Sequence, residues 1–599
     1  MLGLHWLDVA VLGIYFLVIL YVGVVVGAKK TQSLGDFFVA GGKWGSLVGF
    51  VFIFASALGG NEAVVVAKGG YQSGLAGVWY WWAFLIATPV YYLFAVYYRR
   101  ARVYNLSEFL AMRYGQSVSA LFSVLAGLIC IINIGMVLLA IAKILAGMIE
   151  FHSDFEVNVQ VFVWLITFIV AAYVFSGGMM SALLTDLIQG VMCLLILGFI
   201  GLPFLWIEAG GFEALKSLPP EVWNMSSENM TIKTIVALNL SALVGGIAAP
   251  WIFNWISIAK DEKAATQCGW GHLWKRVITL LFAVYGLLFF AYNTNVLSVL
   301  NPALSAQMSA DPELAWGITM KQILPAGVLG LLIASFFAAA MSTVDTYATI
   351  SSAMFVDFLY RRLLRPKESL LHYLKSARVW AVVSVLLAAM STSFIHNISE
   401  YIKLMLNFLS FLGVSIYSAI IWRRANRAGV WASCLMGILS YVVVVAYVMH
   451  VQNLNSFAQA IEPAFELAVF WSTTMALVGM LAGCWLGKQE SAESVMRFHV
   501  ILNTPVGAEQ RLIDAGIRLP ALIDAGLIDE VGDEAVKAEK LRALYAEDAK
   551  DKYFGPKSAI ELRREPTLPW YIPGFVKVVL GCAALVAVTW AVPPILFGH

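Results

Sequence analysis

The chain has 599 residues, of which 60% are hydrophobic and only 13% are charged, and its formal net charge is +2. With a mean hydropathy of +0.80, this composition excludes an ordinary soluble protein and indicates a polytopic membrane protein. The charged residues gather between the apolar stretches, so we expect membrane lipid and a small solute as partners, and no nucleic acid; the oligomeric state is left open.

The apolar stretches follow one another along almost the whole chain. A helix needs about 20 apolar residues to cross a hydrocarbon core of about 30 Å, and we count roughly 14 such stretches. In lipid every backbone polar group needs an internal partner, so the spans are expected to be all α-helical. The predicted spans are residues 4–27, 46–67, 75–98, 118–149, 158–176, 181–207, 233–258, 275–298, 323–358, 378–396, 401–422, 430–450, 464–487 and 568–597.

Basic residues are concentrated in alternate loops between these spans. The basic loops carry Lys29, Lys30, Lys43; Arg99, Arg100, Arg102, Arg113; Lys260, Lys263, Lys275, Arg276; Arg361, Arg362, Arg365, Lys367; and Arg423, Arg424, Arg427. By the positive-inside rule these loops are cytoplasmic. The rule therefore predicts a plasma (inner) membrane protein with both termini outside and a cytoplasmic hydrophilic insert at 488–567.

Two of the predicted spans are interrupted by helix-breaking residues. The first break contains Gly59 and Gly60, followed by Glu62, and the second contains Gly245, Gly246 and Pro250. Such breaks release backbone groups and persist in a membrane where they line a polar cavity. Either break alone also fits a packing glycine or a proline kink. Because they lie five spans apart, we interpret them as matching positions in two inverted five-helix halves, as in secondary transporters.

A third polar feature lies in the middle of the span at 323–358. Ala339, Ser342, Thr343 and Thr346 follow the i, i+3, i+4, i+7 spacing, so they share one helix face, and Asp345 is adjacent. Hydroxyl and carboxylate oxygens without a neighbouring basic residue call for a hard cation. The pattern predicts a site for Na⁺.

Short motifs along residues 5–450 resemble the sodium:solute symporter family, which includes sodium-coupled glucose, galactose, sialic acid, proline and pantothenate carriers. The motifs are Asp36–Lys43, Tyr71–Leu75, Tyr104–Tyr114, Ser176–Gly178, Thr185–Gln189, Ala339–Thr346, Asp357–Tyr360 and Trp422–Gly429. The resemblance implies an all-α, leucine-transporter-like fold, with a five-plus-five inverted repeat and about 14 transmembrane helices.

The resemblance also implies a division of the chain and a set of ion ligands. The expected regions are an extra helix and loop (1–45), a ten-helix core (46–422), two peripheral helices (423–487), the insert (488–567) and a final span (568–599). The insert is read either as two or three amphipathic helices or as a solvated linker. One Na⁺ is expected on the carbonyls of Ala55, Leu58 and Ala339 and the hydroxyls of Ser342 and Thr343. A second Na⁺ is possible on Asp186, Ser342, Asp345 and Thr346.

The solute is expected between the two broken helices, near mid-membrane. The candidate solute-binding residues are Gly59, Gly60, Asn61 and Glu62 from the first break, Trp251 and Asn254 from the second, and Tyr80, Trp81 and Asn133 by the family resemblance. Other roles compete with solute binding. Glu62 could instead form an ion pair with Lys68 or Lys143. Asn133 could form a hydrogen bond to another helix, and Trp81 could be an anchor at the membrane interface. Lys143 itself either binds a solute carboxylate or snorkels.

These features together predict a sodium-coupled symporter that imports a small polar solute by alternating access. A sugar is the first candidate, partly because of Asn61, Glu62 and Asn133, and an amino acid or organic acid is the alternative. A symporter-like membrane sensor is the alternative of another class, and a channel is disfavoured by two breaks in register. We expect no enzyme, because the eight histidines are scattered and no paired nucleophile and base is evident.

Overall fold

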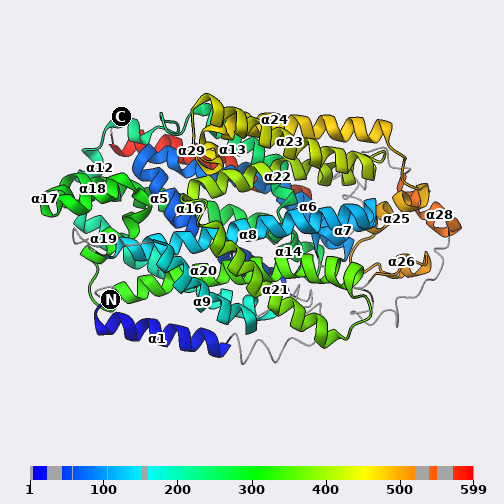
Figure 1. Ribbon diagram of the computed structural model, residues 1–599, viewed down its shortest axis with the longest axis horizontal. Coiled ribbons are helices and arrows are strands. Elements are labelled where there is room, and N and C mark those ends of the chain that lie inside the picture. Colours follow the sequence, from blue (N-terminus) through cyan, green and yellow to red (C-terminus); the bar gives the residue numbers. More distant parts are fainter. Residues whose placement is uncertain are drawn as a thin grey trace.

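The structure is a computed structural model, and it describes residues 4–22, 44–56, 59–103, 105–149, 159–176, 179–519, 522, 538–549 and 571–597. The motif at 36–43 and Leu58 lie outside this part. Its regular elements are helices, with one isolated β-bridge between Trp44 and Ala259. Most long helices run along the long axis of the molecule (Figure 1). The expectation of an all-helical chain is confirmed for the described residues.

The helices of the first half are α1 (Trp6–Leu20), α4 (Ser46–Ser56), α5 (Gly60–Ser73), η3 (Gly74–Val78), α6 (Trp79–Ala101), α7 (Leu106–Tyr114), α8 (Gln116–Gly147), α9 (Val159–Ser176), α10 (Met179–Cys193), η4 (Leu194–Gly201), α11 (Leu202–Glu208), α12 (Gly211–Lys216), η5 (Pro220–Trp223), α13 (Ile232–Gly245), η6 (Gly246–Ala248) and α14 (Pro250–Ser257).

Those of the second half are α15 (Glu262–Ala265), α16 (Gln267–Tyr292), η7 (Asn293–Leu297), α17 (Ser298–Leu300), α18 (Pro302–Ala310), η8 (Pro312–Leu314), α19 (Ala315–Ile323), α20 (Val328–Ser352), η9 (Ala353–Leu364), α21 (Leu370–Ser391), α22 (Ile398–Ile421), α23 (Arg427–Val451), α24 (Phe457–Leu486), α25 (Ala492–Asn503), α26 (Gln510–Asp514), α28 (Ala538–Ala549) and α29 (Tyr571–Phe597).

The described residues contain ten helices that are long and apolar enough to cross a membrane, or eleven if α13 and α14 count as one broken span. This number is lower than the predicted 14. Two apolar helices, α1 and α9, fall in a shorter class, and α5 continues through η3 into α6 as one stretch of 42 residues. A count by helix length and apolarity therefore merges some of the predicted spans and omits others.

The two predicted breaks lie at the ends of short helices. In the first, α4 ends at Ser56, and α5 begins after the extended residue Gly59. In the second, α13 ends at Gly245, and α14 begins at Pro250 with a bend of 47° between the two helices. Pro250 is the first residue of α14, where a backbone N–H would have no acceptor within the helix, so the proline ring removes no helical hydrogen bond. The second break is confirmed at the predicted residues.

The two broken helices are also joined to each other by backbone. Trp44, just before α4, donates its N–H to the carbonyl of Ile258 over 3.2 Å, and Lys260 donates to the carbonyl of Trp44 over 2.9 Å. These two hydrogen bonds form the isolated bridge between the start of the first broken helix and the end of the second. The bridge holds the start of α4 next to the end of α14.

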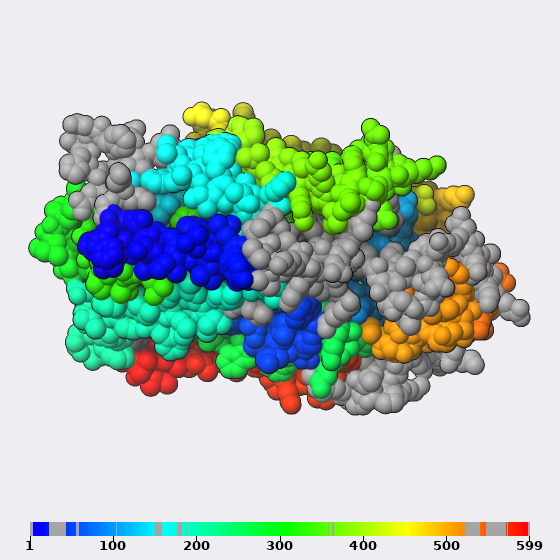
Figure 2. Space-filling view, turned by 90° about the horizontal axis from the view of Figure 1, so that it is seen from below, coloured from blue at the N-terminus to red at the C-terminus, as the bar shows by residue number. Residues whose placement is uncertain are grey.

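One side of the molecule is covered by α1, which Figure 2 shows in blue on the surface. Its outer face exposes large apolar side chains such as Trp6, Ile14 and Leu17, which suits contact with lipid. Its inner face carries Asp8, a buried carboxylate that accepts the N–H groups of Gly327 and Gly330 over 2.7 Å each. Asp8 thereby satisfies free donors at the first turn of α20 and fixes that helix against α1.

The two ends of the molecule differ in what they carry. Both chain ends lie at one end, near α12, α17 and α18, whereas α25, α26 and α28 of the insert lie at the opposite end (Figure 1). The described part of the insert thus has helices, as one of the two interpretations expected. These helices share a small apolar core that includes Ile501, Leu512 and Leu541.

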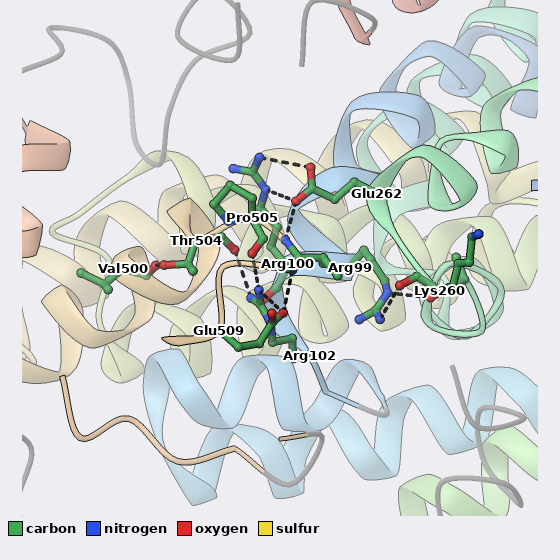
Figure 3. A network of polar contacts seen from close by, with 12 residues as sticks. Arg99, Arg100, Arg102, Lys260, Glu262, Val500, Thr504, Pro505 and Glu509 are labelled. Carbon is green, nitrogen blue, oxygen red and sulfur yellow. Dashed lines mark hydrogen bonds and ion pairs between the residues drawn. The ribbon is translucent and has the colours of Figure 1, made fainter. Parts of the chain in front are cut away.

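Arg102 ties the insert to the end of α6 (Figure 3). This residue has a left-handed backbone with φ of 55°, and its guanidinium donates to the carbonyls of Arg100, Thr504 and Pro505 at 2.6, 3.1 and 2.6 Å. It also contacts the Glu509 carboxylate at 2.9 Å. Four acceptors converge on one planar fork, a geometry that lysine does not reproduce.

Glu262 is the second centre of this network. Its carboxylate pairs with Arg100 at 2.8 Å, accepts the N–H of Val506 at 3.0 Å and accepts the hydroxyl of Tyr571 at 3.2 Å. These donors come from α6, from the insert and from the last helix. The core, the insert and α29 are therefore held by the same carboxylate.

Candidate functional site

The first break lies directly against α20. A Cβ placed on Gly59 would lie 3.4 Å from Thr343 Oγ1, and one on Gly60 would lie 3.9 Å from Ala339 Cβ. The predicted approach of the broken helix to the hydroxyl-bearing helix is present. Ala55 falls in the last turn of α4, and Leu58 lies outside the described residues, so their carbonyls stay a prediction.

The polar face of α20 is fully enclosed. Ser342, Thr343, Asp345 and Thr346 are at most 4% exposed. Within the described residues, Ser342 Oγ and Thr346 Oγ1 have no hydrogen-bond partner, and the Asp345 carboxylate lies beside the Tyr173 hydroxyl. Thr343 Oγ1 donates to the Ala339 carbonyl at 2.8 Å, which leaves its lone pairs available. Buried oxygens without donors are costly, and a bound cation satisfies them.

Asp186 adds a second carboxyl from α10, which packs against α20. It is buried, and it interacts electrostatically with Asp345. The neighbouring Thr185 hydroxyl lies 2.7 Å from the hydroxyl of Tyr173. Two nearby carboxylates repel each other when both are ionised, and a cation between them removes that repulsion. Asp186, Ser342, Asp345 and Thr346 are thus close enough in the fold to act on one region.

A small cavity lies between the two breaks, with a volume of about 30 Å³. Its wall consists of Gly59, Asn61, Trp81, Phe84, Asn133, Trp251, Ile252, Trp255, His272, Lys275, Arg276, Thr343, Tyr347 and Met405. A space of this size holds one or two water molecules, so an organic solute requires a wider state. Thr343 belongs both to this wall and to the polar face of α20, so the two features share a boundary.

Five of the nine predicted solute residues line the cavity, and four do not. Gly59, Asn61, Trp81, Asn133 and Trp251 are part of the wall, whereas Gly60, Glu62, Tyr80 and Asn254 are absent from it. Gly60 instead lines a neighbouring apolar space of about 10 Å³ together with Ala339.

The other three lie near the wall or farther away. Asn254 is three residues beyond Trp251 on α14, and Tyr80 packs toward Gly69 on α5. Glu62 lies one step behind the wall, since its carboxylate is bound to a wall residue, Lys275, and has no exposed surface.

The contacts of two wall residues bear on their alternatives. Asn133 donates to the Ile129 carbonyl at 2.9 Å within its own helix, so its amide does not bridge to another helix through that donor. Trp81 is 8% exposed and faces the cavity, with Lys275 Nζ 5.7 Å from its ring centre. The interpretation of Trp81 as an interfacial anchor is wrong.

The partner of Glu62 was not predicted correctly. Glu62 Oε2 lies 2.7 Å from Lys275 Nζ, its Oε1 lies 3.9 Å from Arg276 Nη1, and Thr279 donates a hydrogen bond to it. Lys275 and Arg276 were expected in a cytoplasmic loop, but both are buried inside α16, which begins at Gln267. His272, Lys275, Arg276 and Thr279 follow the spacing of one helix face, and this signal was missed.

Lys68 and Lys143, the partners proposed for Glu62, instead flank Glu313 in η8. The two ammonium groups lie 2.9 and 2.5 Å from its carboxylate, and Lys143 also pairs with Asp311 at 2.8 Å. Burial acts to raise the pKa of Glu313, but the two ammonium groups outweigh it and hold that pKa at about 2. Lys143 therefore neither snorkels nor lines the cavity, because it forms part of this buried ion network.

Comparisons with known proteins give a consistent assignment. The sequence model of the sodium:solute symporter family matches residues 37–437. The chain is 25% identical over 450 residues to the osmoregulated proline transporter OpuE of Bacillus subtilis, covering 72% of this chain and 87% of that protein. It is 23% identical over 486 residues to mouse sodium/glucose cotransporter 1, covering 72% and 70%.

The fold has a solved counterpart. The structure of a Na⁺-coupled sialic acid symporter in a substrate-bound outward-open state matches with a TM-score of 0.63 at 18% identity. The match covers 81% of this chain and 99% of that one. At this identity the likeness concerns the fold.

Proposed function

Because the chain belongs to the sodium:solute symporter family and is an integral membrane protein, we propose that it couples the entry of Na⁺ to the import of a small polar solute. The observation that carries this proposal is the contact between the first break and the polar face of α20. Gly59 and Thr343 meet there, and several buried oxygens beside them lack donors.

The proposed Na⁺ ligands are those expected from the sequence. One ion is held by the carbonyls of Ala55, Leu58 and Ala339 and by the hydroxyls of Ser342 and Thr343. A second ion is held by Asp186 and Asp345 with the hydroxyls of Ser342 and Thr346. Burial of all five of these side chains supports the assignments, since desolvated oxygens bind a cation in place of water.

The solute is proposed to occupy a widened form of the cavity between the breaks. Thr343 lines that cavity and also belongs to the ion cluster, so Na⁺ and solute act on the same backbone at Gly59. Coupling follows if Na⁺ binds the solute-competent shape more tightly than the other shape. A sugar, an amino acid and an organic acid all remain in the class of small polar solutes.

The available driving force is sufficient for strong accumulation. One charge that moves through about 100 mV releases roughly 2.3 kcal/mol, and a tenfold Na⁺ gradient adds about 1.4 kcal/mol. Together they support roughly 500-fold accumulation with one ion, and two ions square that ratio.

Orientation is also part of the proposal. We assign the end with α25, α26 and α28 to the cytoplasm, and the end with both termini to the outside. The positive-inside rule supports this assignment, because Arg99, Arg100, Arg102 and Arg427 lie in segments that contact the insert or the loops beside it.

The test uses Na⁺ binding, which needs no knowledge of the solute. Thermal unfolding of the purified protein is measured against NaCl at constant ionic strength with KCl, for wild type, Ser342→Ala and Thr343→Ala. Wild type gains stability with Na⁺, and each variant needs roughly tenfold more Na⁺ for the same gain, because a buried ligand is lost. Ser335→Ala is the matched control, since within the described residues its hydroxyl donates to the Leu331 carbonyl of the same helix and to no ion ligand. An unchanged Na⁺ response in both site variants contradicts the ion site.

A further inference from the structure

The cavity wall contains more positive than negative charge. Lys275 and Arg276 are 4% and 1% exposed and face the cavity from α16. In the part of the chain that the structure describes, Glu62 is the one carboxylate within ion-pair distance of either residue. The group of Glu62, Lys275 and Arg276 therefore has two basic side chains for one carboxylate in the buried interior, where an unbalanced charge is expensive.

Arg276 is the less completely paired of the two cations. Its Nη1 donates to the Trp81 carbonyl at 2.9 Å, and its Nη2 lies 3.4 Å from His272 Nδ1. Its Nε is buried and has no hydrogen-bond partner among the described residues. The carboxylate of Glu62 lies much closer to Lys275, at 2.7 Å, than to Arg276, at 3.9 Å. The guanidinium thus has donor capacity and charge to offer to a bound molecule.

The other residues of the wall indicate the shape and polarity of the bound molecule. Trp81, Trp251, Trp255 and Tyr347 supply broad apolar faces, and Trp251 and Tyr347 lie edge to face with ring centres 5.2 Å apart. Asn61 and Asn133 supply the amide groups of the wall. A cavity of this kind favours a compact, partly apolar body with few hydroxyl groups over a fully hydroxylated ring.

We propose that the solute is a small organic carboxylate with a net negative charge, and that Arg276 binds its carboxylate. This inference rests on the proposed symport function and replaces sugar by organic acid as the first candidate. A carboxylate neutralises the excess charge of the wall, which a sugar hydroxyl or an amide does not. A zwitterionic amino acid brings an ammonium group as well, and the acid that would receive it, Glu62, is already bound by Lys275 and Thr279.

The test compares pairs of molecules of similar size, of which one carries a carboxylate and the other is neutral. Purified protein in detergent is titrated with the pairs phenylacetate and phenylacetamide, lactate and lactamide, and gluconate and sorbitol, in NaCl and in KCl. Tryptophan fluorescence and thermal unfolding are recorded, since three tryptophans line the cavity. Carboxylates are expected to give saturable responses that require Na⁺, and their neutral partners to bind at least roughly tenfold more weakly.

Two variants assign the effect to Arg276. Arg276→Gln removes the excess charge and is expected to weaken carboxylate binding roughly 10- to 100-fold, while it leaves the Na⁺ response intact. Arg276→Lys keeps the charge without the fork, and is expected to retain the preference for carboxylates at reduced affinity. The retained Na⁺ response shows that each variant is folded.

The outcomes separate this inference from the symport proposal. Na⁺-dependent binding of the neutral partners with equal strength overturns the carboxylate assignment and leaves symport standing. Carboxylate binding that is unchanged in Arg276→Gln overturns the role of Arg276. A panel in which no carboxylate responds overturns the solute class, and loss of the Na⁺ response in wild type overturns the symport proposal itself.

Discussion

At the scale of single residues, Glu313 is a buried carboxylate whose loss should be costly. It has no exposed surface, and it compensates two buried ammonium groups, Lys68 and Lys143. Glu313→Gln leaves both cations without that charge, so we expect a loss of about 3–5 kcal/mol of stability, measured by thermal unfolding in detergent. Glu213→Gln, which breaks an exposed pair with Lys216, is the control and should leave the unfolding temperature unchanged.

The same carboxylate gives a pH dependence with a defined sign. The pKa of Glu313 is lowered to about 2 in the folded protein, while an unfolded glutamate titrates near about 4.3. The stability that the Glu313 ion pairs contribute is thus fully present above the unfolded-state pKa of about 4.3. It is lost as the pH falls toward the folded-state pKa of about 2. The stability difference between wild type and Glu313→Gln should stay constant from pH 8 to pH 5 and shrink below about pH 4. A difference that grows on acidification would contradict this ion network.

Single residues also show what the sequence could and could not predict. Gly59, Trp81, Trp251 and Thr343 were found from breaks, spacing and resemblance, all of which are local patterns. Lys275 was misplaced because a basic residue near a span end ordinarily marks a loop. Its partner Glu62 lies on another helix, and such a long-range pair leaves no local trace beyond the polar face of α16.

At the scale of helices, the breaks were predictable and their packing was not. The glycine pair and the proline interrupt the helix, so the second break lies where the sequence predicts it. The contact that supports it comes from α22, where a Cβ on Gly413 would lie 1.8 Å from the Val244 carbonyl at the end of α13. The sequence around Gly413 does not predict its contact with Val244, because this contact depends on how α22 and α13, which are distant in sequence, cross.

Gly413→Ala tests this crossing. The added methyl group meets backbone, which cannot rotate away, so α22 and α13 have to separate. We expect a lower unfolding temperature and a reduced response to Na⁺, because the second broken helix shifts. Gly13→Ala on α1 is the matched control: its Cβ would have no neighbour within 4 Å, and a helical alanine should be neutral or slightly stabilising. Equal behaviour of the two variants would exclude a tight crossing.

At the scale of the whole molecule, the orientation is open to direct measurement. All six cysteines of the chain are buried, so introduced cysteines report without interference from exposed native thiols. Glu221→Cys, near the termini, and Glu493→Cys, at the insert, both replace exposed residues. A membrane-impermeant maleimide applied to intact cells should label position 221 at once and position 493 only after permeabilisation. The reverse order would invert the proposed topology.

The shared carboxylate of Glu262 has a practical consequence for anyone who shortens this chain. A version that stops after α24 keeps the family-matched region but discards both Val506 and Tyr571, two of the donors that Glu262 accepts. It also strips Arg102 of three of its acceptors. In such a shortened chain, Glu262 would keep Arg100 and Arg102 would keep the Arg100 carbonyl, but both residues would lose their contacts with the insert and with α29. Shortening the chain to the family-matched region therefore removes contacts that hold the end of α6.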